Sequence, residues 1–178
     1  AGASLLEEKE AGTFDRLLCS KLSMTELLVG KWTYMAVLGM VQITTMFVWG
    51  QLVFSVDLVG HLPGFLVMAA ATACASASFA LFLASVCRSR NQLNAVSVIV
   101  VLGMSARGGS MIPRYLMSES MQRLGKFTFY GWALDGFKKI FWYDQPPSAV
   151  RLEVLVLMLI AILLGFAASV LVRRWSVA

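Results

Sequence analysis

The sequence predicts an all-α integral membrane protein with four transmembrane helices, a cytoplasmic helical segment before them, and interfacial helices before the last crossing. Its 178 residues are 58% hydrophobic and 14% charged, with a mean hydropathy of +0.75, whereas a soluble domain carries about a quarter charged residues. Residues 32–56, 62–87 and 152–172 contain no charged residue except Glu153, and each reaches the roughly 20 residues that cross a bilayer. A fourth crossing is predicted over residues 91–112, where the helix would continue through two glycines.

The first 31 residues are predicted to be helical and cytoplasmic. Gly12 interrupts a polar helix, and Thr13 is a suitable N-cap for a second short helix, which Leu17 and Leu18 anchor. The chain opens without methionine and without the basic and apolar regions of a signal peptide. We therefore expect an N-terminal portion to precede this segment.

The first two crossings are predicted from capping residues as well as from hydropathy. Ser23 followed by Glu26 three residues later forms a capping box, which opens a long helix predicted from about residue 24 to 55. The first crossing, residues 32–56, is the apolar part of this stretch. Pro63 suits the first turn of the second crossing, residues 62–87. The stretch AAATACASAS in this crossing repeats small residues four apart, which lets helix backbones approach closely in lipid.

The third crossing, residues 91–112, begins at another capping box, formed by Ser89 and Gln92. Arg107 lies about 24 Å along this helix from Asn91, near the edge of a hydrocarbon core about 30 Å thick. The arginine could reach the headgroups from there, or it could serve a function inside the membrane.

Residues 113–149 differ in character from the crossings and are predicted to form extracytoplasmic interfacial helices. Eight of the 20 aromatic residues fall between Phe127 and Tyr143, a density typical of a membrane interface. The helix predicted here carries an apolar face (Ala133, Phe137, Ile140, Phe141) and a charged face (Asp135, Lys138, Lys139). Such a helix is expected to lie along a membrane surface.

The last crossing, residues 152–172, is followed by a short tail, residues 173–178. The loop 56–61 carries no lysine or arginine, whereas the loop 88–90 carries two arginines. Basic residues in short loops favour the cytoplasmic side. The chain is therefore predicted to have both of its ends in the cytoplasm.

No catalytic or metal-binding constellation is evident. His61, the sole histidine, is interpreted as a loop residue at headgroup level, because no nucleophile–base pair accompanies it. No phosphate-binding loop is present, so the chain is not predicted to bind ATP or to be an enzyme by itself. The three cysteines lack metal or disulfide spacing. The net charge of +5 is scattered over loops, which argues against a nucleic-acid partner.

Four polar residues of the crossings are candidates for lining a path through the membrane: Gln42, Gln51, Asn94 and Arg107. The three amides could equally join helices by hydrogen bonds. Ionisable groups are otherwise nearly absent from the crossings, which argues against interpreting the chain as a proton relay or an ion-coupled carrier.

Two parts of the sequence resemble a known family, the permease subunits of type-2 ABC exporters, over nearly the whole chain. The first is EEKEAGTFDRLLCSKLSMTELLVGK (residues 7–31), and the second is GGSMIP followed by WALDGF, in the order that the family uses. The matching residues of the first part are Glu8, Glu10, Gly12, Thr13, Leu17, Leu18, Ser23, Glu26, Leu27, Leu28, Gly30 and Lys31. The second part gives an outer-end signature of Gly108, Gly109, Ser110, Met111, Pro113, Trp132, Gly136 and Phe137. Arg107 departs from the family, which has an apolar residue there.

The resemblance implies that these are the last four helices of a six-helix permease half. It also implies a coupling helix that docks on a separate cytoplasmic ATP-binding subunit through Glu8, Glu10, Gly12, Thr13, Arg16, Leu17 and Leu18. That subunit would bind ATP and Mg²⁺, and a second permease half, identical or different, would complete the transporter. The expected function is ATP-driven export by alternating access across a bacterial-type cytoplasmic membrane.

Two functions of other classes also fit the sequence. One is an ATP-independent channel or carrier. The other is a membrane scaffold that recruits a cytoplasmic protein through residues 1–30.

Overall fold

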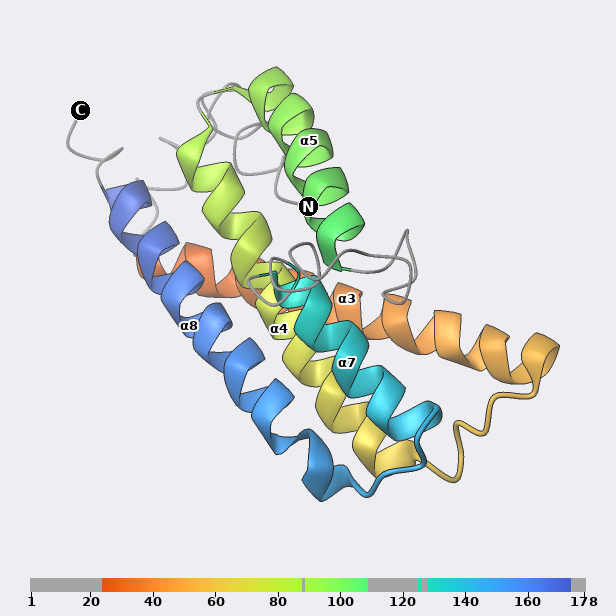
Figure 1. Cartoon of the computed structure of the whole chain (residues 1–178). Helices are drawn as coiled ribbons and strands as arrows, with labels where there is room; N and C mark the ends of the chain where they lie inside the picture. Colours follow the sequence, from red (N-terminus) through yellow and green to blue (C-terminus); the bar gives the residue numbers. More distant parts are fainter. Residues whose placement is uncertain (1–23, 88, 109–124, 126–127, 174–178) are drawn as a thin grey trace.

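The computed structural model describes residues 24–87, 89–108, 125 and 128–173, and every regular element within them is a helix. The elements are α3 (Met24–Phe54), α4 (Leu62–Val86), α5 (Arg90–Gly108), α7 (Phe129–Phe141), the short 3₁₀ helix η2 (Pro147–Val150) and α8 (Arg151–Arg173). Figure 1 shows α4 between α3, α7 and α8. The all-α prediction is confirmed for this part of the chain.

Three of the described helices are long and apolar enough to cross a membrane: Thr25–Phe54, Leu62–Val86 and Pro147–Val172. They overlap the predicted crossings 32–56, 62–87 and 152–172. The predicted third crossing begins in α5, which is not one of these three candidate spans among the described residues. Residues 109–112 lie outside the described residues, so a crossing there stays a prediction.

Helices α4 and α8 lie side by side and run in the same direction (Figure 1). Their contact is built largely from small side chains, as the AAATACASAS stretch predicts. The buried residues of this contact include Ala71, Ala75 and Ala77 of α4 with Leu157, Ala161 and Ala168 of α8.

Helix α3 packs antiparallel to α4 along part of its length. A Cβ atom placed on Gly39 would lie 3.5 Å from the Cβ of Ala73, so the two backbones approach closely here. Further along, the ring centroids of Phe47 and Phe65 are 5.0 Å apart. Beyond this point α3 diverges from α4 and exposes apolar side chains such as Leu52. An exposed apolar surface of this kind is expected of a helix that faces lipid or another membrane helix.

Two predicted helix starts are confirmed. Pro63 lies in the first turn of α4. At the start of α5 the backbone N–H of Gln92 donates to Oγ of Ser89 at 3.2 Å, which is one half of the predicted capping box. Ser23, the other predicted cap, lies outside the described residues.

Helix α7 is the predicted amphipathic helix, and it runs beside α4 in the opposite direction (Figure 1). Its N-cap is Thr128, whose Oγ1 accepts a hydrogen bond from the N–H of Gly131 at 3.3 Å. Ala133 and Ile140 are buried as predicted. Lys139, predicted on the charged face, is half-buried like Asp135 and Lys138, and its ammonium group contacts Glu153 at the start of α8. The position of α7 relative to a bilayer stays a prediction.

Candidate functional site

Apart from Gly108 at the end of α5, the described residues of the outer-end signature lie on α7, where this helix meets α4. Gly136 is buried against Met68, which has no exposed surface. A Cβ atom on Gly136 would overlap the terminal methyl of Met68 and lie 2.7 Å from its sulfur. A side chain at position 136 would therefore displace the end of Met68 if α7 kept this close approach to α4.

Phe137, the next signature residue, belongs to an aromatic cluster that joins α3, α4 and α7. Its ring centroid lies 5.0 Å from that of Phe47 and 6.3 Å from that of Phe65. Phe141 completes the cluster at 4.9 Å from Phe47. Offset and tilted rings at these separations contribute about 0.5–1.5 kcal/mol a pair beyond the burial of their area. The cluster thus fixes one end of α7 to two predicted crossings.

An ion pair between a half-buried lysine and a buried glutamate joins α7 to α8. Nζ of Lys139 lies 2.7 Å from Oε1 of Glu153, and the Glu153 side chain is only 4% exposed. The same ammonium group also donates to the carbonyl oxygen of Ala149 at 3.4 Å. Oε2 of Glu153 is buried and has no hydrogen-bond partner among the described residues. Glu153 lies in a candidate membrane span, Pro147–Val172, and ionisable groups within membrane spans are rare and are normally paired.

Sequence reasoning missed this pair, although one signal was present. Glu153 is the single acidic residue in an otherwise apolar stretch, and it lies in the first turn of α8, where the helix dipole favours a negative charge. A lone carboxylate in such a place requires a cation. The periodicity of α7 alone does not indicate that Lys139 supplies it.

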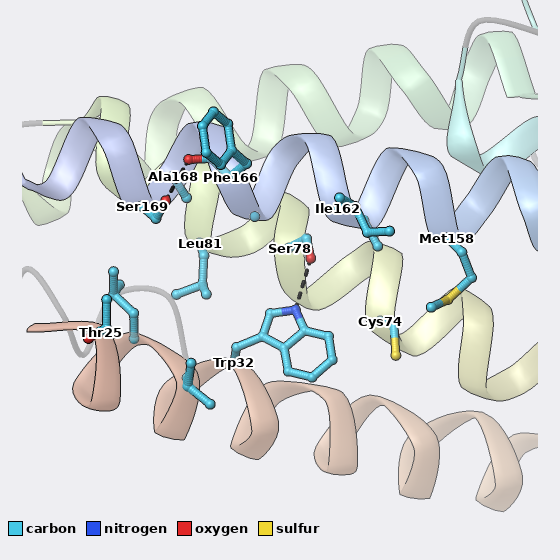
Figure 2. A pocket seen from close by; sticks show the side chains of 14 residues that line it. Thr25, Trp32, Cys74, Ser78, Leu81, Met158, Ile162, Phe166, Ala168 and Ser169 are labelled. Carbon is cyan, nitrogen blue, oxygen red and sulfur yellow. Dashed lines mark hydrogen bonds between the residues drawn. The ribbon is translucent and has the colours of Figure 1, made fainter.

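A groove of about 350 Å³ lies between α3, α4 and α8. Figure 2 shows Trp32 of α3 facing Ser78 of α4, with Met158, Ile162 and Phe166 on α8. The indole Nε1–H of Trp32 donates to Oγ of Ser78 at 2.8 Å, and Ser78 is buried. The polar groups of this pair therefore satisfy each other inside an apolar groove.

Replacing Trp32 by phenylalanine is expected to lower the free energy of unfolding in mixed micelles by about 1 kcal/mol, because interhelical hydrogen bonds of membrane helices contribute about 0.6–1.7 kcal/mol. Ser78→Ala is expected to cost a similar amount. The double variant should cost less than the sum of the single variants, since both remove one bond. Fully additive costs would show that the bond contributes nothing.

A second cavity, of about 340 Å³, lies between α4, α5 and α7. It brings Asn94, one of the predicted path-lining residues, together with Ser76, Ser97 and Tyr130. The other predicted path-lining residues are placed separately: Gln42 is exposed and Gln51 half-buried, both on α3. Arg107 belongs to α5, but its side chain is outside what the structure describes.

The remaining predicted site residues fall outside the described residues, apart from Gly108, which ends α5. They are Glu8, Glu10, Gly12, Thr13, Arg16, Leu17 and Leu18 of the predicted coupling helix, and Gly109, Ser110, Met111 and Pro113 of the signature. In the described ranges, no group of three or more His, Cys, Asp or Glu residues is placed to hold a metal ion.

Comparison with known proteins gives one family match. The family model of the ABC-2 type transporter matches residues 1–142. The chain is also similar to two curated proteins named Inner membrane transport permease YhhJ, from Escherichia coli and from Shigella flexneri, with 27% identity over 122 residues in each. The aligned part is 68% of this chain and 33% of each relative, so the chain spans about a third of the length of these relatives. No solved structure matches the chain.

Proposed function

Because the chain belongs to the ABC-2 type transporter family, we propose that it is the membrane-spanning permease part of an ATP-driven exporter whose ATPase is a separate subunit. The observation that carries this proposal is the extent of the family match, which runs continuously from the predicted coupling segment through α3, α4, α5 and α7. Three helices with the length and composition of membrane spans support a multi-pass membrane protein.

The ATPase is proposed to dock on the coupling segment that contains Glu8, Glu10, Gly12, Thr13, Arg16, Leu17 and Leu18. ATP and Mg²⁺ would be bound by that subunit and not by this chain. A second permease half, identical or different, would complete the translocation path. Both ends of the present chain would lie in the cytoplasm. Closure of the ATPases would then rock the helices between inward-facing and outward-facing states.

The test uses the full-length permease, copurified with its ATPase and reconstituted in liposomes. Glu10→Ala and Thr13→Pro are each expected to lower permease-stimulated ATP hydrolysis about tenfold, within the usual range of coupling between sites. Proline at position 13 also removes a backbone donor where a short helix is predicted to begin. Membrane insertion of both variants is expected to be normal.

Glu7→Ala is the matched control, because it removes the same charge from a position outside the coupling residues. Stimulated hydrolysis that is unchanged in both Glu10→Ala and Thr13→Pro would contradict the coupling assignment. Transport without any ATPase would favour the channel or carrier. Copurification of an ATPase with no effect on its hydrolysis would favour the scaffold.

A further inference from the structure

Two loops far apart in the sequence are joined at the end of the bundle where α4 begins. His61 lies in the turn before α4, and Asp144 lies just after α7. Nε2 of His61 is 2.6 Å from Oδ1 of Asp144, across 83 positions of sequence. The contact ties the connection between α3 and α4 to the connection between α7 and α8.

The second nitrogen of the same ring also has an acceptor. Nδ1 of His61 lies 2.9 Å from the carbonyl oxygen of Asp57. A neutral imidazole has one N–H donor, whereas the imidazolium ion has two. A carbonyl oxygen and an ionised carboxylate can only accept. Both contacts are therefore hydrogen bonds at the same time only when His61 is protonated, and either neutral tautomer leaves a lone pair facing an oxygen.

The backbone around each of the two acceptors is held by local hydrogen bonds. Oδ1 of Asp57 accepts a hydrogen bond from the N–H of Gly60 at 2.9 Å, and a Cβ atom on Gly60 would overlap this carboxylate. Asp144 has a left-handed φ of 51°, and the N–H of the next residue, Gln145, donates to the carbonyl oxygen of Lys139 at 3.0 Å. These bonds fix the backbone that carries each acceptor, whereas the Asp144 side chain itself is 89% exposed.

The histidine ring is also packed against α7. Its centroid lies 5.6 Å from that of Phe141, a member of the aromatic cluster that joins α3, α4 and α7. The link thus connects a titratable side chain to the helix that carries Gly136 and Phe137.

We propose that Asp57, His61 and Asp144 form a proton-operated latch that holds the α3–α4 loop against the corner between α7 and α8 when His61 is charged, and releases it when His61 is neutral. The proposal is about the relative position of these loops, and it does not depend on which cargo the chain transports.

Two carboxylates face His61 among the described residues, those of Asp57 and Asp144, and both favour its charged form. The pKa of His61 is raised above its usual value, first by the hydrogen bond to the carbonyl of Asp57 and then by the bond to Asp144. Because the folded-state pKa is raised, the latch is fully formed below about pH 6.5, the ordinary histidine value. It is lost as the pH rises through the raised pKa.

The test measures the distance between the two loops in the full-length permease in lipid nanodiscs. Nitroxide labels are placed at Val59→Cys and Gln145→Cys, in a background where Cys19, Cys74 and Cys87 are replaced by alanine. At about pH 5.5 we expect a single short, narrow distance distribution, and at about pH 8.5 a broader and longer one, on either side of the ordinary histidine pKa.

His61→Gln is expected to make the distribution independent of pH, since glutamine keeps a hydrogen-bonding group but does not titrate. Asp144→Asn should move the midpoint of the transition to lower pH, because it removes one of the charges that favour the imidazolium. Asp135→Asn, on α7, is the matched control and should leave the midpoint unchanged. A wild-type distance that does not change with pH, or a pH response that survives His61→Gln, would overturn the proposal.

Discussion

Replacing Lys139 by methionine is expected to lower the free energy of unfolding by about 3 kcal/mol. The substitution leaves the carboxylate of Glu153 buried without its cation, and removing one partner of a buried ion pair typically costs about 3–5 kcal/mol. The lower end of that range applies because the Lys139 side chain is 33% exposed, so its contact with the carboxylate is partly screened by solvent. The cost is measured by equilibrium unfolding in mixed micelles.

The double variant Lys139→Met and Glu153→Met is expected to recover most of the loss, because an apolar pair of similar volume can replace a buried ion pair at little cost. Lys138→Met is the matched control: it removes the adjacent positive charge but leaves the pair in place, so its effect should stay within about 0.5 kcal/mol. A double variant as unstable as Lys139→Met would show that packing, and not the unpaired carboxylate, causes the loss.

Introducing valine at Gly136 is expected to cost about 1–3 kcal/mol. The new side chain would overlap the end of Met68, which is fully buried, so either the Met68 side chain must repack or α7 must move away from α4. The contact between Phe137 and the rings of Phe47 and Phe65 should loosen with it. The change is measured as a loss in the free energy of unfolding and as increased proteolysis between α7 and α8.

The control is Gly103→Val on α5, where a Cβ atom meets nothing within 4 Å. Its effect should lie within about 0.5 kcal/mol. Met68→Ala alone should cost about 2–5 kcal/mol by leaving a cavity. Combined with Gly136→Val it should cost less than the sum, because valine fills the vacated space. Strict additivity of these two changes would contradict the overlap.

The helices themselves could be predicted closely from the sequence. The capping box and the apolar stretch placed the first long helix from about residue 24 to 55, and α3 extends over Met24–Phe54. The second and last apolar stretches agree with α4 and α8 to within one or two residues. Hydropathy and capping are local properties of the chain, and membrane helices satisfy their backbone hydrogen bonds locally.

The candidate site could be predicted only in part. The signature correctly singled out Gly136 and Phe137 on α7, but it did not indicate that Met68 and Phe47 are their partners. The bond between Trp32 and Ser78 joins residues 46 positions apart, and neither residue has a pattern that selects the other. The orientation of the Lys139 side chain depends likewise on its ion pair with Glu153 of α8. Side-chain pairing between helices depends on tertiary packing, which periodicity within one helix does not determine.

The close contact of α4 with α8 has a consequence for biosynthesis. Residues 87–150 separate the two helices, so α4 leaves the ribosome well before its partner. During that interval the part of α4 that later packs on α8 has only lipid or a chaperone to meet, and lipid offers its small side chains little packing. Nascent chains halted before α8 should therefore insert α4 but fail to retain it in a stable assembly. Membrane quality-control proteases would then encounter α4 as an orphan helix, and a late stop codon would deplete the protein instead of merely shortening it.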